Sequence, residues 1–499
     1  MELKELIERL DRLQAKKKAY SHATGMLYYD SVTGAPKGGA ENRGNTLAVL
    51  SETVYELSAG EKTGQLLSEL IEKSGELSPV TKRAVNELWR EYERTKKIPE
   101  SEYIEYQMLL NEAENVWHSA KINSDFKSFA PYLEKIFNTN IRFAGYFDPT
   151  EKPYNVMLDM YERGLNTERC DLFFSQLRKK LVPLIAAVSE SSVKPDNLFL
   201  KQSYPVWRQR QLSDWLMEFM GLNRNHCAIG ETEHPFTIPF DKTDVRITTH
   251  YYERDMASSL YSVIHEGGHA LYELHTSDEL KNTCLGSGVS MGIHESQSRF
   301  YENIIGRGRP FCALLLGKLR ELFPERMSGV TEDMLYSAVN ISMPSLIRIE
   351  ADELTYSLHV MLRYELEKAV VEGSLTVSEL PGAWNDKIKE YLGIDVPDDA
   401  RGVLQDSHWS GGSIGYFPAY ALGSAYGAQM LAKLKESIDV DAQIASGDIS
   451  PISAWLEDKI WKHGSMFDPA PLFESCCGPF DPTYYTDYLT RKFTELYNL

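Results

Sequence analysis

Residues 262–273 constrain this chain more than any other segment, because they place a His-Glu-x-x-His pattern inside an apolar stretch of helix length. On an α-helix, positions i and i+4 lie one turn apart on the same face, so His265 and His269 can present two imidazole nitrogens to one ion. Glu266 stands beside them, and a carboxylate next to a metal-bound water can accept the proton of that water. The spacing therefore predicts a metal-binding helix that carries its own general base.

Two glycines lie inside this pattern. Gly267 and Gly268 each cost about 1 kcal/mol of helix stability relative to alanine. That cost is understandable where another group approaches the backbone closely, and we expect a neighbouring strand or a substrate to do so. The alternative interpretation is a buried helix whose two histidines are satisfied by ordinary hydrogen bonds.

A catalytic zinc site usually has a third protein ligand and one position left for water. The best candidate is Glu295, since the loop-like residues 277–292 allow a second helix to pack back against the first, with Glu295 near its start. As alternatives, Glu295 is an ordinary first-turn acid favoured by the helix dipole, or the adjacent His294 is the ligand. Glu302, seven residues further on and on the same face, is expected to accept a ring N–H from a ligand histidine.

Further motifs occur on both sides of these two segments. They are His-Pro-Phe at residues 234–236, Asp-x-Arg-x-Thr at 244–248, Ile-Arg-x-x-Ala-Asp at 347–352, and the aromatic, glycine-rich residues 408–420. Together with the HEGGH and HESQSR segments, they resemble the carboxypeptidase Taq family of metal-dependent carboxypeptidases over essentially the whole chain. The resemblance implies a homodimer, and it nominates Tyr420 as the hydrogen-bond donor to the oxyanion of the reaction. The alternative for Tyr420 is an aromatic residue in a glycine-rich loop without a catalytic role.

The predicted chemistry is metal-assisted hydrolysis of an amide bond. Zinc held by His265, His269 and Glu295 would lower the pKa of its water toward 7, and Glu266 would take the water proton and pass it to the leaving amine. Two histidines and a carboxylate also suit Co²⁺ or Mn²⁺.

Removal of a C-terminal residue requires a group that recognises a free carboxylate, and the planar fork of arginine does so bidentately. Arg348 is the favoured candidate and Arg246 the second. As alternatives, each arginine forms a structural ion pair, Arg348 with Asp352 and Arg246 with Asp244. Two histidines are weaker candidates for substrate contacts, or else core residues: His234 and His408.

The predicted fold is mainly α: a large, helical, zincin-like peptidase with a deep groove and a small β-sheet beside the HExxH helix. Residues 1–499 are expected to form one catalytic unit, with an N-terminal helical lobe of about residues 1–150 covering the groove. The spacing of apolar residues predicts the helices, and short alternating runs with β-branched residues predict the strands. Helices are expected at 3–13, 167–188, 207–220, 311–323, 331–338 and 347–367, strands at 237–240 and 245–249, and loops at 28–39 and 411–427.

The net charge of −19 opposes nonspecific binding to nucleic acid or to an anionic membrane. The N-terminus is charged and amphipathic, which does not fit a secretory signal, and the chain has no run of about 18 apolar residues. Six cysteines are scattered without the spacing of a disulfide framework. We therefore expect a cytoplasmic protein with reduced thiols.

Three hypotheses follow for function. The leading one is a metallocarboxypeptidase that uses a zinc-activated water to hydrolyse the C-terminal bond of peptides with a free C-terminus. The second is a zinc oligopeptidase that cleaves internal bonds. The third is a non-catalytic helical binding protein with a vestigial site.

Overall fold

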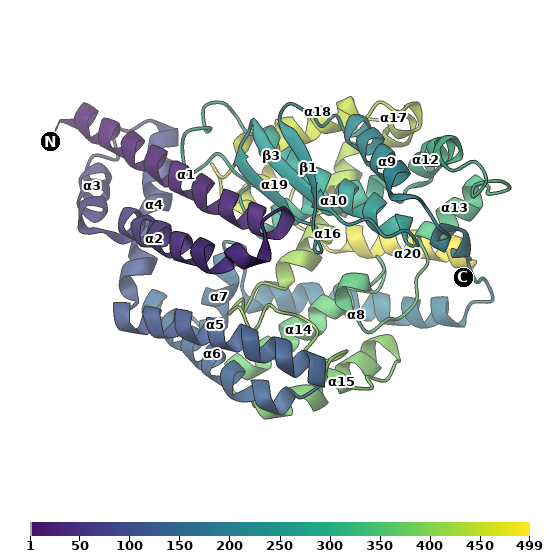
Figure 1. Cartoon of the computed structure of the whole chain (residues 1–499), viewed down its shortest axis with the longest axis horizontal. Coiled ribbons are helices and arrows are strands. Elements are labelled where there is room, and N and C mark those ends of the chain that lie inside the picture. The colour runs from purple at the N-terminus through teal and green to yellow at the C-terminus, as the bar shows by residue number, and fades with distance from the viewer. Residues whose placement is uncertain (1) are drawn as a thin grey trace.

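The computed structural model describes residues 2–499, which form a mainly helical protein, as expected (Figure 1). Residues 2–219 contain helices and their connections but no strand. Its elements are α1 (Leu3–Thr33), α2 (Ala40–Ala59), α3 (Glu61–Glu72), α4 (Pro79–Lys97), α5 (Glu100–Asn123), α6 (Phe126–Phe147), α7 (Pro153–Tyr161), α8 (Thr167–Glu190) and α9 (Val206–Phe219). Within residues 2–499, no helix combines the length and the apolar character needed to cross a membrane.

The strands and the remaining helices follow. They are β1 (Cys227–Glu231), β2 (Thr237–Asp241), β3 (Asp244–Thr249), α10 (Met256–Leu274), α11 (Met291–Arg299), the π-helical turn η3 (Phe300–Ile305), α12 (Arg309–Leu322), α13 (Glu332–Val339), the 3₁₀ turn η4 (Arg348–Glu350), α14 (Tyr356–Val371), α15 (Leu380–Leu392), α16 (Pro418–Leu434), α17 (Val440–Ser446), α18 (Ser450–Lys459), α19 (Pro469–Cys477) and α20 (Thr483–Tyr497). The helices expected at 167–188, 207–220, 311–323 and 331–338 are confirmed as α8, α9, α12 and α13.

Within residues 2–499, the buried apolar side chains form one large core and two smaller ones, the smallest of which consists of Ala84, Leu280 and Leu285. In α1, the leucines spaced three and four residues apart bury their stripe, as the periodicity predicts. This stripe packs with α3 and α4 into the small core of Leu6, Leu10, Leu13, Leu66, Leu67, Leu70, Val85 and Leu88. The large core runs from α5 to α20, and α16 lies deep inside it, in contact with α11, α14 and α20.

A three-stranded sheet lies beside α10, and its strand order is β1-β3-β2. The two predicted strands are confirmed as β2 and β3, which pair antiparallel with Thr237 opposite Ile247. The third strand, β1, was not expected from the sequence and pairs parallel to β3. Strand β2 is an edge strand that contacts α10, so its side chains reach the helix that carries the HExxH pattern.

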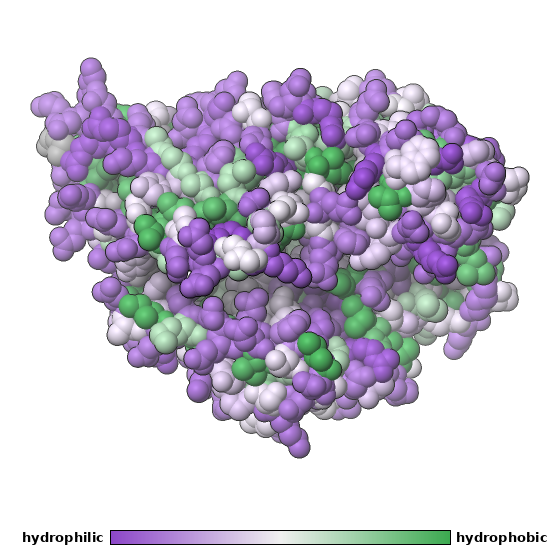
Figure 2. Space-filling view, in the orientation of Figure 1, coloured by the Kyte–Doolittle hydropathy of each residue, from purple (hydrophilic) through white to green (hydrophobic). Residues whose placement is uncertain are grey.

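Helix α1 runs from the N-terminus toward the sheet and reaches it with its C-terminal end, while α5, α14 and α15 lie below the sheet in the same view (Figure 1). Between these upper and lower parts the surface is hollowed (Figure 2). Lys18 of α1 is tied to Asp241 at the end of β2 by an ion pair of 2.5 Å. The ring of Tyr29, also on α1, lies under the guanidinium of Arg246.

Three expectations about local structure are wrong. Helix α1 extends to Thr33 and ends at Gly34, so half of the expected loop at 28–39 is helical. The expected loop at 411–427 turns into α16 at Pro418, which suits the first turn of a helix because it lacks an N–H.

The long helix expected from residue 347 begins only at Tyr356. The carboxylate of Asp352 accepts hydrogen bonds from the backbone N–H groups of Leu354 and Thr355, at 2.9 and 3.1 Å. These bonds favour a turn in the backbone at this point, and Arg348 lies in the separate short turn η4.

Candidate metal centre and active site

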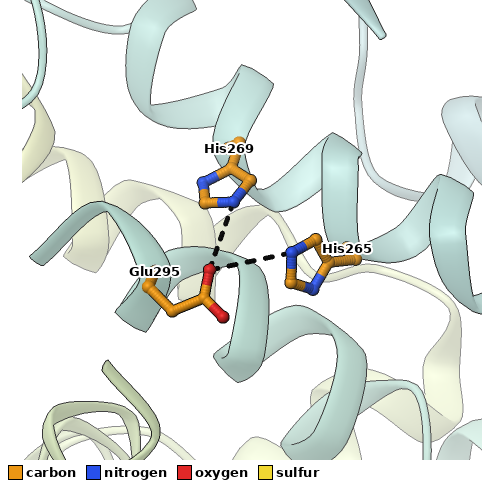
Figure 3. A group of neighbouring side chains, drawn as sticks. All are labelled: His265, His269 and Glu295. Carbon is orange, nitrogen blue, oxygen red and sulfur yellow. Dashed lines mark ion pairs between the residues drawn. The ribbon is translucent and has the colours of Figure 1, made fainter. Parts of the chain in front are cut away.

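Three side chains predicted as metal ligands converge from two helices (Figure 3). His265 and His269 lie one turn apart on α10, and Glu295 is the fifth residue of α11. Glu295 Oε2 lies 3.4 Å from His269 Nε2 and 3.7 Å from His265 Nε2, and one ligand atom from each residue lies within 4.8 Å of the others.

These distances suit a tetrahedral zinc ion. With metal–ligand bonds of about 2.0–2.1 Å, neighbouring ligand atoms of a tetrahedron are about 3.4 Å apart. Both distances to Glu295 are close to that value. Two imidazoles and one carboxylate also leave the fourth position for water or substrate, as catalytic zinc sites require. The residues present therefore fit a divalent metal ion.

Glycines allow α11 to lie directly between α10 and α16. A β-carbon on Gly268 would come within 2.7 Å of the backbone oxygen of Gln297, and one on Gly423 within 2.6 Å of Cγ of Glu295. The neighbour that approaches the backbone of α10 at Gly268 is a helix, rather than the strand or substrate expected. At Gly267 it is the side chain of Met220. The glycines thus set the distance between the two ligand-bearing helices.

Glu295 is buried and remains ionised. Burial alone would raise its pKa, but the charges of Arg299 and His265 outweigh burial and hold the pKa far below its usual range. Arg299 Nε donates to Glu295 Oε1 at 2.7 Å, which leaves Oε2 facing the histidines. A negative ligand oxygen is therefore available where a cation would sit.

The outer nitrogen of His265 lies 2.9 Å from Glu302 Oε2, as the sequence predicted. Glu302 lies in the π-helical turn η3 that continues α11, and π-turns often occur at functional sites. Arg299 and Arg307 each approach its carboxylate to 3.2 Å. With Nδ1–H donated to Glu302, His265 presents its Nε2 lone pair to the site.

Glu266, the predicted general base, is held by a residue that sequence reasoning missed. The hydroxyl of Thr237, on β2, donates to Glu266 Oε2 at 2.6 Å. The Glu266 side chain is buried, and burial raises its pKa. A raised pKa makes the carboxylate a better proton acceptor at neutral pH. No sequence pattern identifies Thr237, because only the pairing of β2 beside α10 brings it there.

His294, the rival ligand, turns its ring to the outer side of His269. The two Nδ1 atoms lie 2.6 Å apart, and His294 Nε2 lies 2.7 Å from Glu273 Oε1. Both nitrogens of His294 are therefore occupied: one faces the outer nitrogen of His269, and the other faces Glu273, so neither faces the position between His265, His269 and Glu295.

Arg348 is buried, and the ion pair with Asp352 that the sequence offered as its alternative role is wrong. It pairs with Asp406 rather than with Asp352: its Nε and Nη2 lie 3.0 and 2.9 Å from Asp406 Oδ1. The other oxygen of Asp406 accepts from Arg363 Nε at 2.6 Å. Two arginines thus share one carboxylate, and this group of three side chains carries a net positive charge.

Tyr420 lies on the first turn of α16, the helix that packs against α11. The guanidinium of Arg348 lies 5.0 Å from the centre of its ring, and Gly423, which touches Glu295, follows one turn later. His408 Nε2 lies 3.3 Å from the Tyr420 hydroxyl. Burial, followed by the charge of Arg348, lowers the pKa of His408 to about 4, so this ring is neutral at pH 7.

The remaining two candidates lie near the sheet. Arg246, on β3, is held bidentately by Asp244 at 3.0 and 2.9 Å, so the ion pair proposed from the sequence exists. His234 is exposed in the connection between β1 and β2, where its backbone carbonyl accepts a hydrogen bond from Thr232.

A helical body, an HExxH helix and a carboxylate delivered by the next helix define a metallopeptidase of the HExxH class. A family model described as carboxypeptidase Taq (M32) metallopeptidase matches residues 9–493. The chain belongs to this family and is a metal-dependent carboxypeptidase.

Individual relatives agree with the family assignment. The chain is 41% identical over 482 residues to carboxypeptidase 1 of Bacillus subtilis, with 96% of each chain covered. It is 35% identical to thermostable carboxypeptidase 1 of Thermus thermophilus, again with 96% of each covered. The crystal structure of an M32 carboxypeptidase from Deinococcus radiodurans superposes with a TM-score of 0.96 at 34% identity, covering 99% of this chain and 100% of the other.

Proposed function

We propose that this carboxypeptidase uses zinc, held by His265, His269 and Glu295, to remove C-terminal residues from peptides. The convergence of these three side chains, with Glu266 fixed beside them by Thr237, carries the proposal. A divalent ion in this position polarises the scissile carbonyl and lowers the pKa of a bound water. Co²⁺ and Mn²⁺ suit the same donor set.

The protein's own groups then move the protons. Glu266 takes the proton of the attacking water and hands it to the leaving amine, and its raised pKa suits both transfers. The hydroxyl of Tyr420 donates a hydrogen bond to the oxyanion that develops on the carbonyl. Because the pKa of this buried hydroxyl is well above its usual value, it keeps its proton throughout.

Arg348 is the proposed partner of the substrate's terminal carboxylate. The cluster of Arg348, Arg363 and Asp406 has two positive charges and one negative, so a second carboxylate would neutralise it. His408 adds no charge at pH 7, and we propose that it contacts the substrate beside Tyr420, whose hydroxyl lies 3.3 Å from His408 Nε2. Arg246 and His234 are proposed as more distant contacts along the peptide, on the sheet side of the groove.

The N-terminal helices are proposed to cover the groove as one lobe of a single catalytic unit. The separate small core of α1, α3 and α4 supports this arrangement, as does the attachment of α1 to the sheet through Lys18 and Asp241. From the sequence we further propose a cytoplasmic homodimer that acts on peptides with a free C-terminus.

Digestion of one peptide in two forms tests the proposal. The free-acid form is expected to yield a ladder of products shortened from the C-terminus, and the C-terminally amidated form is expected to remain intact. A chelator should stop the reaction, and added Zn²⁺ should restore it. Internal fragments from the amidated peptide, seen by mass spectrometry, would instead indicate an endopeptidase, while no cleavage with or without metal would indicate a vestigial site.

A further inference from the structure

The Nδ1 atoms of His265 and His269, which face away from the proposed metal position, have different hydrogen-bond partners. His265 faces the carboxylate of Glu302 directly, whereas His269 faces another imidazole, that of His294, with the two Nδ1 atoms 2.6 Å apart. The far nitrogen of His294 lies 2.7 Å from Glu273 Oε1. A chain of three side chains therefore leads from the inner face of His269 to a buried carboxylate.

The proton positions in this chain follow from its two ends. Glu273 accepts, so His294 Nε2 carries a hydrogen and the Nδ1 of a neutral His294 has a free lone pair. That lone pair accepts the Nδ1–H of His269, which places the lone pair of His269 on Nε2. His269 Nε2 is the atom that lies 3.4 Å from Glu295. The chain thus selects the tautomer of His269 that can bind a metal.

The surroundings hold this chain in one position. Glu273 is 3% exposed, and its Oε1 also accepts hydrogen bonds from the Ser287 hydroxyl at 2.8 Å and from Gly288 N at 3.2 Å. A β-carbon on Gly288 would come within 2.5 Å of Cδ2 of His294, so only glycine leaves room for the ring. The ring of Tyr272 also packs against the ring of His294, with 5.2 Å between the two ring centres.

We propose that His294 and Glu273 are positioning residues that orient His269 for the metal, with Gly288 making the space that His294 requires. The inference rests on the proposed role of His269 as a metal ligand. Groups that hold the outer nitrogen of a ligand histidine commonly contribute 10- to 100-fold to metal affinity. His294 therefore acts on the metal through His269 instead of as an alternative ligand.

Metal affinity, measured by competition with a chelating dye, tests this role independently of activity. His294→Leu removes both hydrogen bonds, and its Kd for Zn²⁺ should rise about 10- to 100-fold. His294→Asn places an amide oxygen where Nδ1 lies and should recover part of that loss. Gly288→Ala leaves every hydrogen-bonding group in place but displaces the His294 ring, so it should weaken binding in the same direction.

Two matched substitutions serve as controls. His118→Gln changes an exposed histidine on α5, and Gly317→Ala fills open space on α12. Both should bind Zn²⁺ like the wild type. The visible spectrum of the Co²⁺ form should change in the His294 variants and in Gly288→Ala but not in the two controls, because the spectrum reports the geometry of the ligands. Melting of each metal-free variant shows whether it is folded.

The outcomes separate this inference from the proposed function. If the wild type binds no Zn²⁺ with measurable affinity, the proposed function fails. If the wild type binds Zn²⁺ and folded His294→Leu and Gly288→Ala bind it equally well, with unchanged Co²⁺ spectra, the positioning role is wrong and the proposed function stands. Should His294→Leu not fold, the same comparison rests on His294→Asn and Gly288→Ala.

Discussion

Replacement of Asp406 by asparagine tests the buried charge cluster most directly. Asp406 bonds to Arg348 through one oxygen and to Arg363 through the other. Asparagine has nearly the same shape but no charge, so the substitution leaves two buried guanidinium groups without a counter-ion. Arg363 cannot turn toward water, because it is 0% exposed and stacks against Trp384, with 4.5 Å between its guanidinium carbon and the ring centre.

The size of the effect follows from this burial. Removing one partner of a buried ion pair costs about 3–5 kcal/mol, since the remaining charge stays desolvated. For a chain of 499 residues the entropy of unfolding is roughly 1 kcal/mol per kelvin, so the melting temperature should fall by about 3–5 °C. Substrate affinity should change as well, since Arg348 loses the group that orients it.

Calorimetry of Asp406→Asn beside Asp398→Asn provides the comparison. Asp398 pairs with Arg401 at the surface, where their side chains are 31% and 55% exposed, and solvent-screened pairs of this kind contribute little to stability. The control should therefore melt within about 1 °C of the wild type. Equal shifts for the two variants would refute the claim that Asp406 compensates two buried charges.

Four further outcomes are expected. Glu266→Gln should retain its metal and lose about 10²- to 10⁴-fold in kcat, measured with a defined peptide, since it keeps the shape but not the base. Gly423→Ala should weaken Zn²⁺ binding in a dye-competition assay, because the new β-carbon meets Glu295. Removal of Zn²⁺ should lower the melting temperature, and its return should restore it, because an ion that binds only the folded state stabilises it. Burial raises the pKa of Glu162 to about 7 from 4.5, so the folded protein holds this proton more tightly than the unfolded chain does. The resulting stability is complete below about pH 4.5 and is lost as the pH rises through 7. Melting curves should therefore show the wild type losing stability relative to Glu162→Gln between about pH 4.5 and 7.

Each of these outcomes has a result that contradicts it. Full activity in Glu266→Gln would exclude Glu266 as the base. Unchanged affinity in Gly423→Ala would mean that α16 does not set the position of Glu295. A melting temperature indifferent to Zn²⁺ would argue against a metal site in the folded state, and parallel pH curves for Glu162→Gln and the wild type would show that Glu162 keeps its ordinary pKa.

Glu162 also illustrates a residue that the sequence does not reveal. Its Oε2 accepts a hydrogen bond from Gly292 N at the start of α11, the helix that carries Glu295. Three other residues likewise hold a site residue by a hydrogen bond: Thr237 bonds to Glu266, Glu273 to His294 and Asp406 to Arg348. Each lies far along the chain from its partner or in a segment without a distinctive pattern, so only the packing of the elements pairs them.

The sequence by itself determined what depends on short spacings. The i, i+4 histidines, the leucine stripe of α1 and the alternation in β2 and β3 follow from the periods of helix and strand, which need only neighbouring residues. The approach of Glu295 to the two histidines was also foreseen, because one loop-like connection allows the second helix to fold back onto the first.

Only the tertiary structure decided the partners. Arg348 is near Asp352 in sequence, yet it bonds to Asp406, because a backbone turn, in which Asp352 accepts a hydrogen bond from Thr355 N, separates η4 from α14. His294, adjacent to Glu295, supports His269 instead of taking part in the three-residue group, because α11 turns successive side chains about 100° apart. Spacing along a chain defines which groups can share a face, whereas the side chains that finally meet depend on how closely the helices pack. Here the glycines at 268 and 423 set that distance, and Gly288 leaves room for the ring of His294.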